Sequence, residues 1–251
     1  MKWFFQRLWA FWFYFVFGGL FLILSPLFYI LLSREAWYPA ADKLRRFWAF
    51  LLFPLLGVLP RITYAEKLDP KQRYIFCANH SSYLDIPYFG FIFHGVHVFM
   101  AKAELKKIPI FGMFFGTIDI AVDRGNKAAS YGALKEGARR LDMGANLIIF
   151  PEGGISKKAP LMRSFKDGSF KLAIEKKISI VPITFLDNWR IFHDNGKVLG
   201  RPGISRAVVH KPIRFEEMTD ISSLKQKVYD IIEGPLKEHY EDRFRNDSTI
   251  G

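Results

Sequence analysis

The residues best suited to chemistry follow a short apolar run, Tyr74–Ala78. Asn79 and His80 come directly after it, and Asp85 ends the sequence Asn-His-Ser-Ser-Tyr-Leu-Asp. A histidine and an aspartate in one turn suit a general base and its orienter. The carboxylate can accept the proton of one imidazole nitrogen, which leaves the other free to deprotonate a hydroxyl. Asn79 could tie down the loop backbone through its amide. Taken alone, the spacing also fits a helix N-cap at Asp85 and a surface histidine.

Three further polar clusters accompany short apolar runs. Asn146–Phe150 leads into Pro151-Glu152-Gly153-Gly154-Ile155-Ser156, the run from Gly116 ends in Asp123-Arg124-Gly125, and Val181-Pro182-Ile183-Thr184 is a short run interrupted by proline. Loops that leave the carboxyl ends of parallel strands gather at one edge of a sheet, where ligands bind. We therefore expect these clusters to lie near His80.

The elements that position these residues alternate along the chain beyond Pro60. Apolar strands separated by helical stretches predict an α/β domain, with a mixed, largely parallel sheet flanked by helices. The clearest helix is Lys127–Met143, which has apolar side chains at helical spacing. The predicted strands are Arg61–Ala65, Tyr74–Ala78, His97–Met100, Ile118–Val122, Asn146–Phe150, Ile178–Phe185 and Arg206–His210, and the other predicted helices are Asp85–Phe93, Gly168–Lys177 and Ser222–Phe244.

The amino-terminal segment has a different composition. Leu8–Ser33 is an uncharged run of 26 residues. As a helix it would measure roughly 39 Å, which exceeds the hydrocarbon core of about 30 Å. A second uncharged run, Phe47–Pro60, is short for a span and carries Pro54. We therefore predict a hydrophobic two-helix membrane module at residues 1–60 and a catalytic domain at 61–251. The alternative is one span followed by a buried core helix. Both flanks of the first run are basic, so the charges do not decide its orientation.

Composition excludes several classes of protein. Half of the 251 residues are hydrophobic, which excludes a disordered chain, and the single cysteine excludes a disulfide framework or a cysteine-based zinc site. No phosphate-binding glycine loop is present, and His94 and His97 lack further ligands at zinc spacing. We expect no metal and no cofactor. The net charge of +12 could serve nucleic acid or anionic lipid, but no nucleic-acid-binding signature accompanies it.

Taken together, the four blocks resemble the glycerolipid acyltransferase family, specifically the 1-acyl-glycerol-3-phosphate acyltransferases. The family motifs are N-H-x-x-x-x-D, a block ending in D-R, F-P-E-G-[TS]-R-S and V-P-[IV]. Here they correspond to Asn79–Asp85, Asp123-Arg124, Phe150–Ser156 and Val181–Ile183. Ala101–Leu105, Pro109–Gly112 and Phe165–Gly168 also look like family features. The resemblance covers roughly residues 60–215.

The resemblance implies a role for each block. His80 would deprotonate an acceptor hydroxyl that attacks an acyl thioester directly, without an acyl-enzyme, and Asp85 would orient His80. Backbone N–H groups near the Pro151–Gly153 turn would stabilise the oxyanion. The expected substrate-binding residues are Arg124, Glu152, Gly153, Lys102 and Asn79.

The third block departs from the family pattern at one position. Ile155 stands where the family has an arginine. Lys102, Lys157, Lys158 or Arg163 could supply that charge, or the acceptor could carry less phosphate. Lys157–Arg163 could equally be a solvated loop.

The function implied is transfer of an acyl chain from acyl-CoA or acyl carrier protein to the sn-2 hydroxyl of 1-acyl-glycerol-3-phosphate, which makes phosphatidic acid. The expected partners are these substrates and anionic membrane lipid, with no nucleic acid. The expected location is the cell's inner membrane, with the site facing the cytoplasm, where acyl thioesters are made. The alternatives are acylation of another lysolipid, such as a lyso-aminolipid, or of glycerol 3-phosphate, and a catalytically dead lipid-binding protein.

Overall fold

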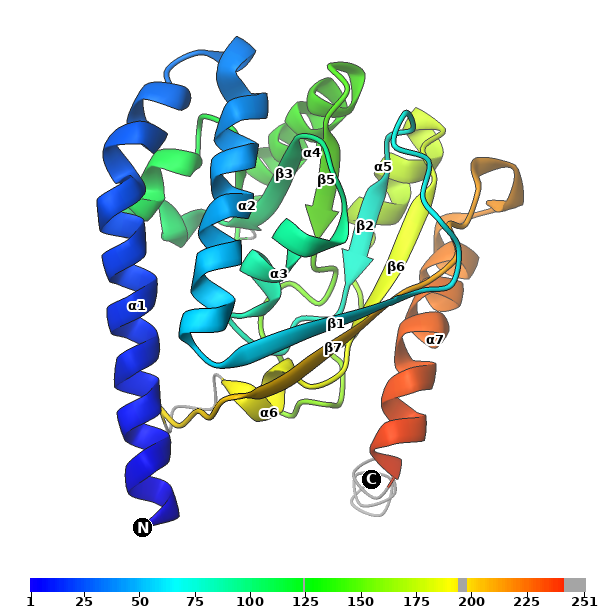
Figure 1. Ribbon diagram of the computed structural model, residues 1–251. Coiled ribbons are helices and arrows are strands. Elements are labelled where there is room, and N and C mark those ends of the chain that lie inside the picture. Colours follow the sequence, from blue (N-terminus) through cyan, green and yellow to red (C-terminus); the bar gives the residue numbers. More distant parts are fainter. Residues whose placement is uncertain (124, 194–197, 242–251) are drawn as a thin grey trace.

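A twisted sheet forms the centre of the computed structural model, which describes residues 1–123, 125–193 and 198–241 (Figure 1). Within these residues seven strands follow the order β1-β7-β6-β2-β5-β3-β4, and only β6 and β7 pair antiparallel. The predicted mixed, largely parallel sheet is therefore confirmed. The strands are β1 (Val58–Tyr64), β2 (Ile75–Ala78), β3 (His97–Lys102), β4 (Ile120–Val122), β5 (Asn146–Ile149), β6 (Ile180–Phe185) and β7 (Gly203–Val209).

Helices cover both faces of this sheet, as the strand–helix alternation predicts. The α-helices are α1 (Lys2–Leu31), α2 (Tyr38–Leu55), α3 (Asp85–Ile92), α4 (Lys127–Asp142), α5 (Gly168–Lys176), α6 (Asn188–Ile191) and α7 (Ile221–His239). Four short 3₁₀ helices lie between them: η1 (Glu35–Trp37), η2 (Ala103–Lys107), η3 (Phe111–Phe114) and η4 (Phe215–Glu217). Two boundaries show why these ends form. Asp220 caps α7 by accepting from two backbone N–H groups, and Lys177 ends α5 in the left-handed conformation.

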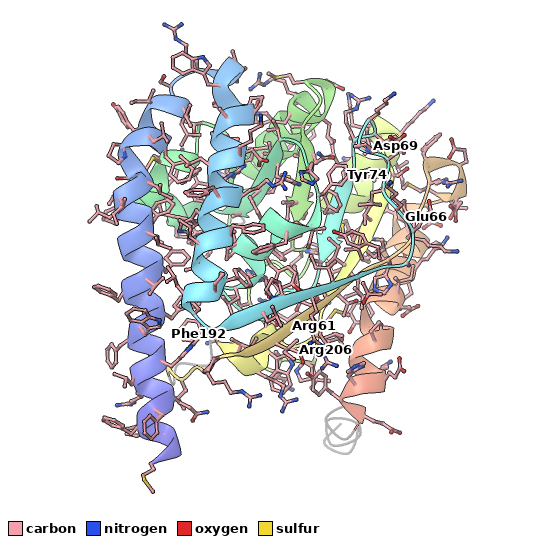
Figure 2. All side chains as sticks on the ribbon, in the orientation of Figure 1. Arg61, Glu66, Asp69, Tyr74, Phe192 and Arg206 are labelled. Carbon is pink, nitrogen blue, oxygen red and sulfur yellow. The ribbon has the colours of Figure 1, made fainter. Side chains whose placement is uncertain are left out.

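The long helix α1 runs along one side of the domain (Figure 1). One stripe of it is buried, including Ala10, Phe13 and Phe28, while other large apolar side chains such as Phe15 and Ile23 remain exposed. Phe192, from the loop after α6, packs against Phe13 with ring centroids 4.4 Å apart (Figure 2). Among the described residues, α1 is the one helix long and apolar enough to cross a membrane, judged by length and composition.

The second uncharged run, Phe47–Pro60, does not form one element. It is divided between the end of α2 and the start of β1. α2 begins earlier than the run, at Tyr38, and buries eight side chains, while Phe47, Phe50 and Leu55 remain exposed. Its contact with α3 is close, because a Cβ added at Gly90 would lie 2.9 Å from the Cβ of Ala49. The expected boundary after residue 60 falls within β1.

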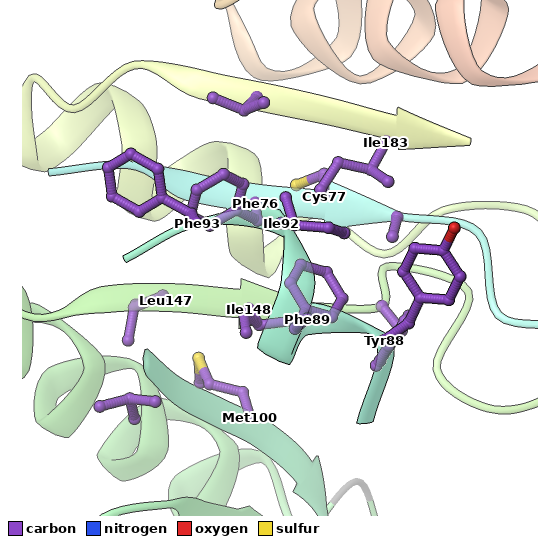
Figure 3. Close-up of a cluster of buried hydrophobic side chains, with 14 of the residues drawn as sticks. Phe76, Cys77, Tyr88, Phe89, Ile92, Phe93, Met100, Leu147, Ile148 and Ile183 are labelled. Carbon is purple, nitrogen blue, oxygen red and sulfur yellow. The ribbon is translucent and has the colours of Figure 1, made fainter. Parts of the chain in front are cut away.

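The apolar core lies between β2 and the helices beside it. Every residue of β2 is buried, and Phe76 packs with Phe89 and Phe93 of the following segment (Figure 3). Cys77 is fully buried there, and burial raises the pKa of its thiol to about 12, as expected for a structural cysteine. β2 is buried on both faces and ends at Ala78. The polar residues Asn79 and His80 follow it and therefore lie at the carboxyl end of the parallel strands.

Candidate active site

His80 and Asp85 form a hydrogen-bonded pair in the turn between β2 and α3. The His80 Nδ1 atom lies 2.9 Å from Asp85 Oδ2. The Asp85 side chain is fully buried, whereas the His80 side chain is 12% exposed. The imidazole stacks on the Phe150 ring with centroids 4.0 Å apart. With Nδ1 held by the carboxylate, Nε2 is the nitrogen left for a substrate.

Asp85 is held on both of its oxygens. Oδ2 also accepts hydrogen bonds from the backbone N–H groups of Ser81 and Ser82, at 2.6 and 2.9 Å. Oδ1 accepts from the Asn188 side-chain amide at 2.7 Å. Asn188 in turn accepts from the Ser205 hydroxyl and is itself fully buried. These donors fix the carboxylate and stabilise its charge away from water.

Glu152 clamps the loop that carries His80. Its Oε1 atom accepts from the His80 backbone N–H at 2.7 Å, and its Oε2 atom accepts from the Arg163 backbone N–H at 2.8 Å. The Ser156 backbone N–H donates to the His80 carbonyl at 2.9 Å, so both backbone groups of His80 are tied to the same loop. Burial raises the pKa of the Glu152 carboxyl to about 7, although the two backbone donors oppose this shift.

Asn79 ties the active-site turn to the neighbouring strand. Its amide donates to the Phe185 carbonyl at 3.0 Å and accepts from the Phe185 N–H at 2.7 Å. The side chain is buried. Both ends of the amide therefore bind backbone at the end of β6, which is a positioning contact.

A large apolar cavity of about 510 Å³ opens onto His80. Phe13, Phe17 and Phe21 of α1 form part of its lining. Other aromatic side chains come from the region of η3, including Phe111 and Phe114. Gly153, Gly154, Ile155 and Lys102 also line it, so the helix α1 and two of the sequence blocks meet at one space.

The expected cations differ in their placement. Lys102 lines the cavity, with a 59% exposed side chain that pairs with Glu104 at 2.9 Å. The Arg163 guanidinium lies beside the third block, because a Cβ added at Gly154 would be 3.4 Å from its Nη1 atom. Ile155 presents an apolar side chain to the cavity. Arg124 lies outside the described residues.

Gly153, Gly154 and Ile155 of the third block differ in their backbone hydrogen bonds. The Gly153 N–H donates to the Phe150 carbonyl at 3.0 Å, with Gly153 at φ +79°, a conformation that favours glycine. Among residues 1–123, 125–193 and 198–241, the N–H groups of Gly154 and Ile155 have no hydrogen-bond acceptor. Both residues line the cavity at His80.

Sequence reasoning missed Asn188 and the lining of the cavity. Asn188 follows the fourth block, but it lies 103 residues from Asp85. A polar residue just after a buried strand is a weak signal, and nothing near Asn188 indicates its partner. In the part of the chain that the structure describes, no group of three or more His, Cys, Asp and Glu side chains is arranged to hold a metal ion.

Comparisons with known proteins identify the family of this chain. The family described as Acyltransferase matches residues 60–186, just over half of the chain. The chain is 32% identical over 203 residues to the 1-acyl-sn-glycerol-3-phosphate acyltransferase of Saccharomyces cerevisiae, covering 78% of this chain and 66% of that protein. It is 29% identical over 164 residues to the protein of the same name from Haemophilus influenzae, covering 61% of this chain and 65% of that protein. It therefore spans slightly less than two thirds of the length of these relatives.

A solved structure shares the fold. The crystal structure of the 1-acyl-sn-glycerophosphate acyltransferase PlsC from Thermotoga maritima superimposes with a TM-score of 0.76. The match covers 95% of this chain and 97% of that chain, at 24% identity. The family match includes the first block with His80 and Asp85, the third block with Glu152 and the fourth block at the start of β6. The chain belongs to the acyltransferase family.

Proposed function

We propose that this protein transfers a fatty acyl chain from an acyl thioester to the sn-2 hydroxyl of 1-acyl-glycerol-3-phosphate, in phospholipid biosynthesis. The observation that carries this proposal is the His80–Asp85 pair facing an apolar cavity of about 510 Å³. A general base such as His80 beside an apolar cavity suits a reaction between a lipid hydroxyl and an acyl chain. The relatives' names support the same reaction class.

The cavity accounts for binding of the acyl chain. Its aromatic walls from α1 and η3 remove methylene groups from water, and each buried CH₂ contributes about 0.8 kcal/mol. The carbonyl would lie near His80, which lines the cavity together with Gly153 and Gly154. Acyl-CoA and acyl carrier protein both present such a thioester.

In the proposed reaction, His80 Nε2 takes the proton of the acceptor hydroxyl as its oxygen attacks the thioester carbonyl. Asp85 holds the imidazole through Nδ1 and stabilises the imidazolium that forms. The tetrahedral oxyanion would accept hydrogen bonds from the Gly154 and Ile155 amides, since the Gly153 amide is already bound. The carbon–sulfur bond then breaks, and the imidazolium returns the proton to the leaving thiolate. No acyl-enzyme forms.

The acceptor's phosphate needs a cation near the third block. Arg163 lies beside Gly154, Lys102 lines the same cavity, and Arg124 is expected to contribute. An arginine suits this role because its planar fork donates two parallel hydrogen bonds to phosphate. Ile155 favours a second candidate function, acylation of a lysolipid with less phosphate at this position, such as a lyso-aminolipid.

We also propose that α1 holds the protein on a membrane. Its exposed face carries Phe4, Phe11, Phe15 and Ile23, which are apolar and 64–74% exposed. The proposed location is the inner membrane, with the site open to the cytoplasm, where acyl thioesters are made.

An acceptor panel tests the proposal with the wild type and His80→Ala. With a fixed acyl-CoA, we expect turnover with 1-acyl-glycerol-3-phosphate and a loss of about 10²–10⁴-fold in His80→Ala. The readout is the acylated product. Turnover of a lyso-aminolipid with refusal of 1-acyl-glycerol-3-phosphate would favour the second candidate. Full activity in His80→Ala would remove the general-base assignment.

A further inference from the structure

A second cavity, of about 520 Å³, lies where β1, β7 and α6 meet. Four arginines line it, Arg61, Arg190, Arg201 and Arg206, and we call this group the arginine basin. Within the described chain, no residue lines both this cavity and the one at His80. The basin is therefore a separate feature that the proposed reaction does not use.

The sheet register brings two of these cations together. Arg61 of β1 and Arg206 of β7 are direct partners in the parallel pair, as their adjacent labels in Figure 2 show. Like charges opposite each other on neighbouring strands destabilise a sheet. A negatively charged ligand would relieve this repulsion.

The carboxylate in the basin neutralises one of the four arginines. Asp187 binds Arg206 through two hydrogen bonds of 2.7 and 2.8 Å and also accepts from the Tyr240 hydroxyl at 2.9 Å. Among residues 1–123, 125–193 and 198–241, no carboxylate pairs with Arg61, Arg190 or Arg201. Three positive charges thus face the cavity without compensation.

Two of these unpaired arginines are held by uncharged partners. The Arg201 Nε atom donates to the Arg190 carbonyl at 3.1 Å, and the Arg190 guanidinium lies over the Tyr240 ring at 5.8 Å. Side chains ordered before a ligand arrives lose less entropy when it binds. Arg61, Arg190 and Arg201 are exposed, so a ligand can reach all three guanidinium groups.

The rest of the basin is apolar and adjoins α1. Ile204 is 44% exposed and Pro202 lies beside it. The neighbouring Gly200 donates its N–H to the Gln6 carbonyl of α1 at 3.1 Å, and it packs against the Trp9 ring too closely to carry a Cβ. Guanidinium groups next to exposed apolar side chains and an apolar helix match a lipid phosphate better than a free ion.

We propose that the arginine basin binds the phosphate of an anionic lipid headgroup, at a site distinct from the active site. Phosphate presents several oxygens to guanidinium forks. The apolar side chains of Pro202 and Ile204 would contact the glycerol and the first methylenes. This proposal does not rest on the acyl-transfer reaction.

Amide hydrogen exchange on the full chain in an uncharged detergent tests the proposal. The probe is dihexanoyl phosphatidic acid, with dihexanoyl phosphatidylcholine as the comparison of low net charge. We expect phosphatidic acid to protect the peptide at residues 200–206 in the wild type. In Arg61→Ala/Arg201→Ala the apparent Kd should rise at least about tenfold, since one lost charge-assisted hydrogen bond is worth about 1.5 kcal/mol or more.

A matched control removes two cations elsewhere. Arg214→Ala/Lys225→Ala alters the net charge equally, but both side chains pair with carboxylates outside the basin. It should bind as the wild type does. If the Ala variant has a lowered Tm, Arg61→Gln/Arg201→Gln replaces it. Protection at residues 79–86 reports on the active site separately, so failure of the proposed reaction would not be mistaken for failure of the basin.

Each remaining outcome overturns the proposal. Equal affinity in the wild type and the basin variant would remove the arginines from the site. Equal loss of binding in the control would show a general effect of charge. Inorganic phosphate and coenzyme A form two further arms, and protection of residues 200–206 by either of them, with none by phosphatidic acid, would assign the basin to a soluble phosphate.

Discussion

Asn188 is the residue whose replacement most sharply tests the active-site geometry. Its amide donates to Asp85 Oδ1 at 2.7 Å, while the other carboxylate oxygen keeps its own donors from His80, Ser81 and Ser82. Asn188→Ala should therefore leave Asp85 bound to His80 but less firmly oriented. The lost hydrogen bond to a charged group is worth about 1.5–3 kcal/mol.

If that loss appears fully in the transition state, kcat falls by about 10- to 150-fold. KM for both substrates should stay unchanged, because Asn188 does not line the cavity at His80. The assay follows thiol release from the acyl-thioester donor, with rates expressed per folded molecule. The folded fraction comes from thermal unfolding in the same detergent.

Asn146→Ala is the matched control for this experiment. Asn146 is a buried asparagine whose side-chain oxygen accepts from the Tyr74 N–H at 2.9 Å. Neither residue is among the hydrogen-bond partners of Asp85 given above. It should lose stability but keep its kcat. A wild-type kcat in Asn188→Ala, or an equal fall in Asn146→Ala, would refute the positioning role.

Three further results are expected. Glu152→Gln should flatten the pH dependence of stability, because burial raises the pKa of the Glu152 carboxyl in the folded protein to about 7. The raised pKa stabilises the wild type below the ordinary carboxyl pKa of 4.5, where Glu152 is protonated. Relative to the variant, the wild type should lose up to about 3 kcal/mol of unfolding free energy as pH rises from 4.5 to 7, measured by denaturant titration. A parallel pH slope in both proteins would contradict this. Phe76→Ala should lower the unfolding free energy by about 3–5 kcal/mol in the same assay, because the ring is fully buried; a loss under about 1 kcal/mol would be too small for that core. Gly90→Ala should lower the unfolding free energy by about 1–3 kcal/mol, because the new Cβ would crowd Ala49 across the α2–α3 contact. A variant as stable as the wild type would show that the two helices can move apart freely.

The hydrogen-bonded pair of His80 and Asp85 was predictable because it is local in sequence. His80 and Asp85 belong to one turn, and a buried strand before them indicates where that turn begins. The strand pattern also predicted the sheet, with β1 extended to Val58 and β4 shortened to begin at Ile120. The long apolar run likewise predicted α1.

Roles assigned to single residues were less predictable. Asn79 was expected to tie down the loop backbone, and the resemblance implied that Asn79 and Glu152 bind substrate. In the structure their side chains bind backbone groups of Phe185, His80 and Arg163. A polar side chain close to His80 can bind substrate or hold the backbone. Only the position of distant backbone decides between them.

Sequence by itself determined the class of fold, the His80–Asp85 pairing and the apolar helix, since each depends on periodicity or on neighbours along the chain. Tertiary structure alone decided that Asn188 reaches Asp85, that α1 lines the cavity at His80 and that Arg61 lies opposite Arg206. The physical reason is the strand order. It places β7 beside β1 and β6 beside β2, and so brings together side chains that no local pattern connects.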